Sequence, residues 1–229
     1  MWPVEFNGYH SRRMPEPFRV ELYWSFRSPY SYLALPRVKR LAAEYPVQWD
    51  IRVVYPLAMR VPGYFRHMNP LARPYFLRDT RRVAEFLGVP FKRPVPDPIV
   101  QDPVTLEIAD SQPTIHRLTL LGAEATLRGR ALAFIDEVSR LLWDGSVTGW
   151  DQGEHLARAA GRAGLDLGEM ERALAADPAP RKALIEANQA AQQAAGHWGV
   201  PLFVFEGEPF FGQDRIDVLL WRMKQKGLQ

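Results

Sequence analysis

The sequence predicts an α/β fold in which a βαβ unit and a later ββα unit bracket a large all-helical insertion. Two observations carry this prediction. Strand-like alternation of apolar residues is confined to residues 18–54 and 202–211, and the long segment between them shows helical periodicity instead. We therefore expect residues 18–63 and 198–229 to form one α/β domain, residues 64–197 to form a helical insertion domain, and residues 1–17 to be an N-terminal extension.

The first strand is predicted at Phe18–Phe26, with the sequence FRVELYWSF. Every second residue from Val20 to Phe26 is apolar, and Tyr23 on the opposite face is apolar as well. A strand that is apolar on both faces is typical of a sheet covered on both sides. We therefore place this strand in the centre of the sheet.

A helix is predicted at Tyr30–Glu44, and Ser28 and Pro29 suit its N-cap and its first helical position. The next segment, Val47–Val54, alternates strictly between apolar and polar residues and predicts a second strand. Because the connection is short and helical, the three elements predict a right-handed βαβ unit with parallel strands.

The middle of the chain contains six segments with helical periodicity, and the proline-rich residues 89–103 form an irregular link between two of them. The predicted helices are Tyr75–Leu87, Thr114–Leu121, Glu124–Trp143, Asp151–Ala163, Leu167–Ala175 and Arg181–Gly196. Strand patterns return at Leu202–Phe205 and Pro209–Phe211, and a helix with Ile216, Leu219, Leu220 and Met223 on one face follows.

Composition excludes several classes of function. The 229 residues include no cysteine, so the chain itself performs no disulfide exchange or thiolate catalysis. The five histidines lack a paired metal-binding spacing, so we expect no metal site. The net charge of +3 comes from interspersed charges without a concentrated basic stripe, which argues against nucleic acid and suits a small anionic ligand. Neither a secretory signal nor a membrane span is apparent, so we expect a cytoplasmic protein.

Ser28 is the first candidate site residue, because it lies at the carboxyl end of the first strand. Open α/β sheets bind ligands at this edge, and the N-terminus of the following helix favours an anion such as a thiolate. A plain N-cap role also explains a serine here.

The tetrad Ser28-Pro29-Tyr30-Ser31 stands where proteins of the thioredoxin fold carry Cys-x-x-Cys. The longer segment FRSPYSYLA resembles the opening of 2-hydroxychromene-2-carboxylate isomerases and of the related kappa-class glutathione transferases. The resemblance implies a thioredoxin-like fold of the DsbA type. It also implies that Ser28 contacts the sulfur of bound glutathione.

A second match lies at His197–Asp217, with the sequence HWGVPLFVFEGEPFFGQDRID. It is similar to the family pattern in which a Val-Pro peptide precedes the penultimate strand. The resemblance implies that Val200-Pro201 is cis and that its backbone pairs with the thiol ligand. It further implies that Gln213 and Asp214 bind the γ-glutamyl end of glutathione, although Asp214 also suits the N-cap of the last helix.

A third and weaker match covers residues 73–91, which resemble the first insertion helix of the isomerases. Arg73, at the entrance of this helix, is the residue there that we expect to bind a carboxylate of glutathione or of the organic substrate. A solvated helix face explains the other charges equally well. Residues 94–114 and 143–150 depart from the isomerase pattern.

The resemblance implies a glutathione-dependent isomerase that acts on an aromatic carboxylate from aromatic-compound breakdown, with Ser28 stabilising the glutathione thiolate. A kappa-like glutathione transferase or peroxidase is one alternative, distinguished by consumption of glutathione. A non-catalytic binding protein with a thioredoxin-like groove is another. Both related families form dimers, so the resemblance also implies a homodimer.

Overall fold

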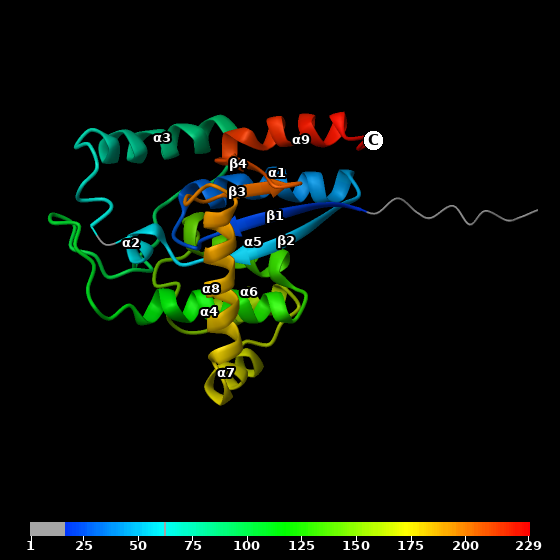
Figure 1. Ribbon diagram of the computed structural model, residues 1–229. Coiled ribbons are helices and arrows are strands. Elements are labelled where there is room, and N and C mark those ends of the chain that lie inside the picture. Colours follow the sequence, from blue (N-terminus) through cyan, green and yellow to red (C-terminus); the bar gives the residue numbers. More distant parts are fainter. Residues whose placement is uncertain (1–16, 62) are drawn as a thin grey trace, which may run out of the picture.

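The computed structural model describes residues 17–61 and 63–229, and its four-stranded sheet has the order β2-β1-β3-β4 (Figure 1). β1 (Phe18–Trp24) pairs in parallel with β2 (Val47–Val53) and antiparallel with β3 (Leu202–Phe205), and β3 pairs antiparallel with β4 (Glu208–Phe211). The predicted central strand and parallel βαβ unit are confirmed. β1 ends two residues earlier than predicted, because Ser25 O accepts a hydrogen bond from Ser28 N at 3.0 Å and closes a turn.

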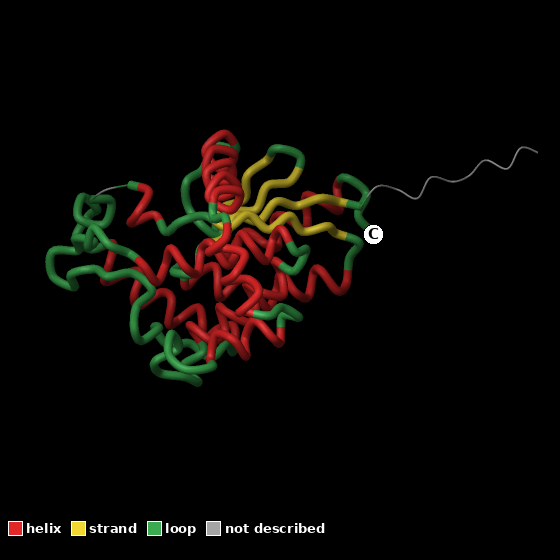
Figure 2. Tube along the Cα trace, turned by 90° about the horizontal axis from the view of Figure 1, so that it is seen from below, coloured by secondary structure: helices red, strands yellow, loops and turns green. Residues whose placement is uncertain are grey.

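Helices cover both faces of the sheet (Figure 2). On one face, buried β1 side chains such as Leu22 and Trp24 join a large core with α1 (Pro29–Glu44) and α9 (Ile216–Gln225). On the other face, Tyr23 joins a smaller cluster that includes side chains of α8 (Ala179–Ala194). β1 is thus apolar on both faces because helices cover both sides of the sheet, as predicted.

In the described chain between β2 and β3 the regular elements are helices, joined by irregular loops and accompanied by one isolated bridge between Gln101 and Ile108. The helices there are α2 (Leu57–Arg60), α3 (Ala72–Leu87), α4 (Pro113–Leu127), α5 (Ala131–Trp143), α6 (His155–Arg162), α7 (Leu167–Ala176) and α8. The thioredoxin-like fold with a helical insertion is confirmed, while the exact domain boundaries stay a prediction. None of the described helices is long and apolar enough to cross a bilayer.

The predicted break between two insertion helices at residues 122–123 is wrong. α4 continues through Gly122 and ends before Gly129, which has a positive φ of 68°. A Cβ on Gly122 would lie 2.9 Å from the ring of Phe26 and 3.0 Å from Val53, so this glycine allows close packing of α4 against the sheet. Gly129 is the true terminator, because positive φ favours glycine.

Other helix ends differ from the predictions by a few residues. α3 begins at Ala72 instead of Tyr75, and α8 begins at Ala179 instead of Arg181, because proline is tolerated in the first turn of each helix. α6 begins only at His155, after Gly153 with a positive φ of 54°. The short helix α2 was not predicted, because four residues carry no periodic signal.

Candidate functional site

Ser28 is the N-cap of α1, as predicted. Its Oγ accepts a hydrogen bond from Ser31 N at 3.1 Å, and Pro29 occupies the first helical position. The first turn of α1 contains no acidic residue. The partial positive charge of the helix N-terminus is therefore available to an anion near the Ser28 hydroxyl.

The Ser28 hydroxyl faces the second motif of the sequence, the Val200-Pro201 peptide. This peptide is cis, as the resemblance implies. Ser28 Oγ donates a hydrogen bond to Val200 O at 3.2 Å, although the two residues are 172 positions apart. The two strongest motifs of the sequence therefore meet at one point, the carboxyl end of β1.

Three consecutive carbonyls, those of residues 198–200, are each held by a side chain. Arg60 of α2 donates to the first at 2.7 Å, Gln192 of α8 donates to the second at 2.6 Å, and Ser28 donates to the third. Arg60 also donates to the side-chain oxygen of Gln192 at 3.0 Å. These contacts fix the backbone that leads into the cis peptide.

Arg60 is unusual because its described hydrogen bonds all go to neutral oxygen atoms. Burial lowers the pKa of Arg60 to about 10, so the guanidinium remains protonated at neutral pH. A charged donor makes stronger hydrogen bonds to carbonyls than a neutral one does. Arg60 therefore holds this segment through charge-assisted contacts.

His197 holds the same segment from a different side. Its Nδ1 accepts a hydrogen bond from Gly199 N at 2.9 Å, and its ring stacks on Trp198 and Phe211 with centroid distances of 4.5 and 4.0 Å. Burial lowers the pKa of His197. The neutral ring is the form that can accept this bond, because a protonated imidazole has only donors.

A cavity of about 300 Å³ opens beside Ser28 and Val200. Its wall is largely apolar and includes the aromatic residues Tyr30, Tyr64, Phe65, Phe76, Phe91, Trp143, Trp198 and Phe211. The charged residues of the described wall are three arginines, Arg27, Arg73 and Arg93, and no described lining residue is acidic. Such a wall suits a flat ligand with negative charge.

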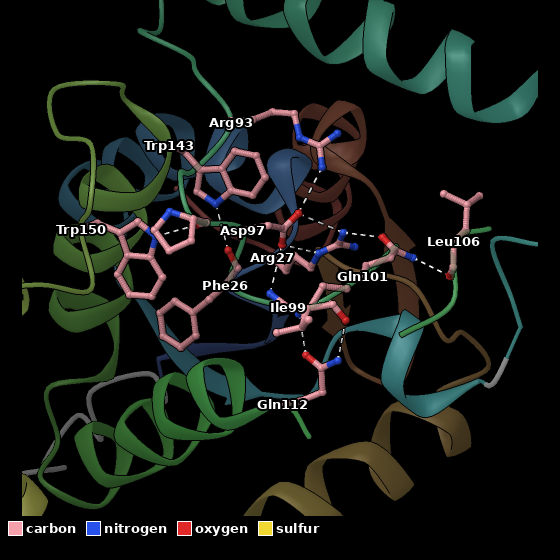
Figure 3. A network of polar contacts seen from close by, with 12 residues as sticks. Phe26, Arg27, Arg93, Asp97, Ile99, Gln101, Leu106, Gln112, Trp143 and Trp150 are labelled. Carbon is pink, nitrogen blue, oxygen red and sulfur yellow. Dashed lines mark hydrogen bonds and ion pairs between the residues drawn. The ribbon is translucent and has the colours of Figure 1, made fainter. Parts of the chain in front are cut away.

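Arg27 is the centre of a polar network on this wall (Figure 3). Its Nε and Nη2 donate to the two oxygens of Asp97 at 2.8 and 3.1 Å, and Nη2 also donates to the side-chain oxygen of Gln101 at 2.8 Å. Arg93 donates to the same carboxylate at 3.2 Å. Asp97 thus bridges two arginines and joins the loop between α3 and α4 to the end of β1.

Two tryptophans from outside the loop contact it. Trp150 Nε1 donates to Pro96 O at 2.8 Å, and the ring of Trp143, whose Nε1 donates to Phe26 O at 2.9 Å, stacks on Phe91 with a centroid distance of 5.7 Å. The buried amide of Gln112 exchanges two hydrogen bonds of 2.8 Å with the backbone of the residue at position 100. The loop therefore has fixed contacts despite its irregular backbone (Figure 3).

Tyr30, in the middle of the serine motif, also lines the cavity. Its hydroxyl donates to Asp79 Oδ2 at 2.6 Å. Burial, together with this acceptor carboxylate, raises the pKa of Tyr30. The Tyr30 hydroxyl therefore stays protonated and donates to Asp79 of α3, whereas the Ser28 hydroxyl donates to Val200 O.

The other predicted site residues divide into two groups. Arg73 is exposed and lines the cavity with Ser28 and Val200. Pro201 O accepts a hydrogen bond from Gly212 N at 2.9 Å, which places the turn of residues 212–215 behind the cis peptide. The two residues predicted to bind the γ-glutamyl group lie on this turn and do not line the cavity.

Gln213 is buried, and both its main-chain and side-chain oxygens accept hydrogen bonds from Arg37. Asp214 is exposed and pairs with Arg215 at 2.8 Å. The alternative reading of Asp214 as an N-cap is wrong, because it lies inside a single 3₁₀ turn, Gln213–Arg215, and makes no capping bond. The proposed contacts of Gln213 and Asp214 with glutathione stay predictions.

Sequence reasoning missed two sets of residues at this site. Arg27 pairs with Asp97 and Gln101 across 70 and 74 positions, and Arg60 reaches Gln192 across 132. None of these residues belongs to a periodic pattern or a short motif. For Asp97 and Gln101 there was one signal, the departure of residues 94–114 from the family pattern.

Comparison with known proteins agrees with this fold. The fold is similar to that of 2-hydroxychromene-2-carboxylate isomerase, with 22% identity, coverage of 90% of this chain and 95% of that one, and a TM-score of 0.66. It is also similar to a probable DsbA oxidoreductase from Streptomyces coelicolor, with 23% identity, coverage of 91% and 89%, and a TM-score of 0.63. No curated protein matches the chain.

A further similar structure is the cytosolic disulfide reductase DsbM from Pseudomonas aeruginosa with GSH, at 17% identity, coverage of 90% and 99%, and a TM-score of 0.53. Identities this low show a shared fold. The family itself is shown by residues 19–224, which match the DSBA-like thioredoxin domain. The chain belongs to the family of DSBA-like thioredoxin domains.

Proposed function

We propose that the protein is a glutathione-dependent isomerase of an unsaturated aromatic carboxylate. The observation that carries this proposal is the contact between the Ser28 hydroxyl and Val200 O at the cis peptide, at the N-terminus of α1. In a chain without cysteine, this arrangement has no thiol of its own to stabilise. A thiol-bearing ligand is therefore the natural occupant.

The residues present fit glutathione. The Ser28 hydroxyl can donate to its sulfur, the backbone of Val200 can pair with its peptide, and Arg73 lies on the same wall for a carboxylate. When bound, glutathione supplies a thiolate that adds to an activated carbon–carbon double bond and later leaves it. Gln213 and Asp214, beyond the cis peptide, are the proposed contacts for its γ-glutamyl end.

The chain's own residues act in three ways. Ser28 and the N-terminus of α1 favour the charged form of a neighbouring thiol. The Ser28 hydroxyl can donate a hydrogen bond to the thiolate, and the N-terminus of the helix carries a partial positive charge. Arg60 and Gln192 hold the backbone against which the thiol ligand pairs. The aromatic wall orients a planar second substrate and excludes water.

The proposal is tested in two steps. Calorimetric titration should show that glutathione at millimolar concentration binds the wild-type protein. Turnover of an unsaturated aromatic carboxylate should then require glutathione without consuming it, as shown by titrating the remaining thiol. Ser28→Ala should keep the fold and glutathione binding but lose most of the activity.

Each alternative gives a different result. Stoichiometric loss of glutathione would identify a transferase or peroxidase that uses the same site. Absence of glutathione binding would indicate a binding protein that has kept only the groove. Unchanged activity of Ser28→Ala would refute the role assigned to this serine.

A further inference from the structure

The charge of the cavity wall is unbalanced. Its described lining contains three arginines and no acidic residue, and the nearest anion of the network, Asp97, is shared by two of them, Arg27 and Arg93. One carboxylate between two guanidinium groups leaves a net positive charge at this point. A largely apolar wall makes that charge effective, because few competing polar groups surround it.

Arg27 is held more rigidly than the other two arginines. Its side chain is only 13% exposed, and Nε and Nη2 are bound by Asp97 and Gln101. Gln101 presents its oxygen to Arg27 because its nitrogen donates to Leu106 O at 2.9 Å. A guanidinium fixed in this way is preorganised for a ligand, since little side-chain freedom remains to be lost.

One nitrogen of Arg27 remains available. Within residues 17–61 and 63–229, Nη1 makes no hydrogen bond, although the side chain lines the cavity. Charged N–H groups in such surroundings bind anionic oxygen atoms. Arg93 is the second donor on the same wall, and its side chain is 45% exposed.

We propose that Arg27, with Arg93, binds the carboxylate of the aromatic substrate, and that Asp97 and Gln101 are positioning residues for Arg27. This inference rests on the proposed function, which it deepens by assigning the second substrate its anchor. Arg27 directly precedes Ser28 in the chain, and both residues line the cavity. The anchor therefore lies beside the hydroxyl assigned to the thiol, so that a bound carboxylate fixes the reactive carbons against it.

The test measures binding in the absence of glutathione. Cinnamate is the anionic probe, and cinnamamide is its neutral counterpart of nearly the same shape. Wild-type protein should bind cinnamate at least about tenfold more tightly than cinnamamide, the effect of one charge-assisted hydrogen bond. Arg27→Met should lose this preference by weakening cinnamate about tenfold while leaving cinnamamide within about twofold.

A second variant guards against a folding defect in the first. Asp97→Asn keeps the size of the side chain and one oxygen that can still accept from Arg27 Nε and position it, while the competing negative charge is removed. Cinnamate should therefore bind at least about twofold more tightly, and cinnamamide should not change. Arg19→Met is the matched control, because it breaks an arginine–aspartate pair at Asp50 that lies outside the cavity. It should leave both affinities unchanged.

Two results would overturn the assignment. One is a wild-type protein that binds the two probes equally well, or an Arg27→Met variant that keeps the wild-type preference for cinnamate. The other is a loss of affinity for glutathione, titrated separately, in place of the loss for cinnamate, because the recognised carboxylate would then belong to glutathione. If wild type fails to bind glutathione but keeps the preference for cinnamate, the proposed function fails and the anchor stands.

Discussion

Replacing Ser28 with alanine should raise the pKa of the bound glutathione thiol by about one unit. A hydrogen bond to a charged group contributes about 1.5–3 kcal/mol, and a neutral one about 0.5–1.5 kcal/mol. Since Ser28 Oγ already donates to Val200 O at 3.2 Å, turning its proton to a thiolate gains only the difference. That difference, about 1–1.5 kcal/mol, corresponds to about one pKa unit.

The helix contribution survives this substitution, because the positive end of α1 belongs to the backbone. The thiol in Ser28→Ala should therefore remain more acidic than free glutathione. Loss of the N-cap costs about 1 kcal/mol of stability, equivalent to about 2–4 °C in Tm for a chain of this size. Thermal unfolding and thiol titration thus report two separate consequences of one change.

The measurement is the ultraviolet absorbance of the thiolate, recorded against pH with glutathione fully bound. Ser28→Thr is the control, because threonine keeps both the hydroxyl and the capping oxygen. An unchanged thiol pKa in Ser28→Ala would refute the reasoning. An equally large shift in Ser28→Thr would refute it as well, because it would trace the effect to side-chain packing.

Three further predictions concern the surroundings of the site. Gln192→Met and Arg60→Met each remove a donor to the carbonyls of residues 198–200, so calorimetry should show glutathione binding weakened about fivefold; equal affinity would contradict the positioning role. Because burial lowers the pKa of His197, its contribution to stability is present above about pH 6.5 and is lost as the pH falls through the pKa of the folded state. His197→Phe should therefore lose this pH dependence of the thermal unfolding temperature. If the dependence persisted in the variant, another titrating group would be its source. Trp143→Phe leaves the buried carbonyl of Phe26 without its donor, so the free energy of unfolding measured by urea denaturation should fall by about 1–3 kcal/mol. An unchanged value would show that the carbonyl finds another partner.

The thioredoxin-like half of the fold could be predicted because its signals are local. β1 is apolar on both faces, Ser28 and Pro29 mark the start of α1, and alternation defines β2. The cis state of Val200-Pro201 came from the resemblance alone, and the structure confirms it. Each of these features depends on residues that are neighbours in sequence or belong to a recognisable motif.

The insertion was harder to predict because its details depend on tertiary contacts. Gly122 looks like a helix break in sequence, yet it lies inside α4. The absence of a side chain there lets the ring of Phe26 approach the helix closely. Arg27 and Asp97 look like ordinary surface charges, and only the folded chain brings them together on the cavity wall. Local patterns do not encode such pairings.

The loop of residues 88–112 has a consequence for how this site could change during evolution. Its contacts with the rest of the molecule include those of Arg27 with Asp97, of Trp150 with Pro96 O and of Trp143 with Phe91, whereas Ser28 and the cis peptide belong to other segments. A replacement loop that kept these attachments would present a new wall to the cavity and leave the thiol site in place. Under the proposed function, such a replacement would change the selectivity for the second substrate, while the proposed thiol site would be retained with the sheet.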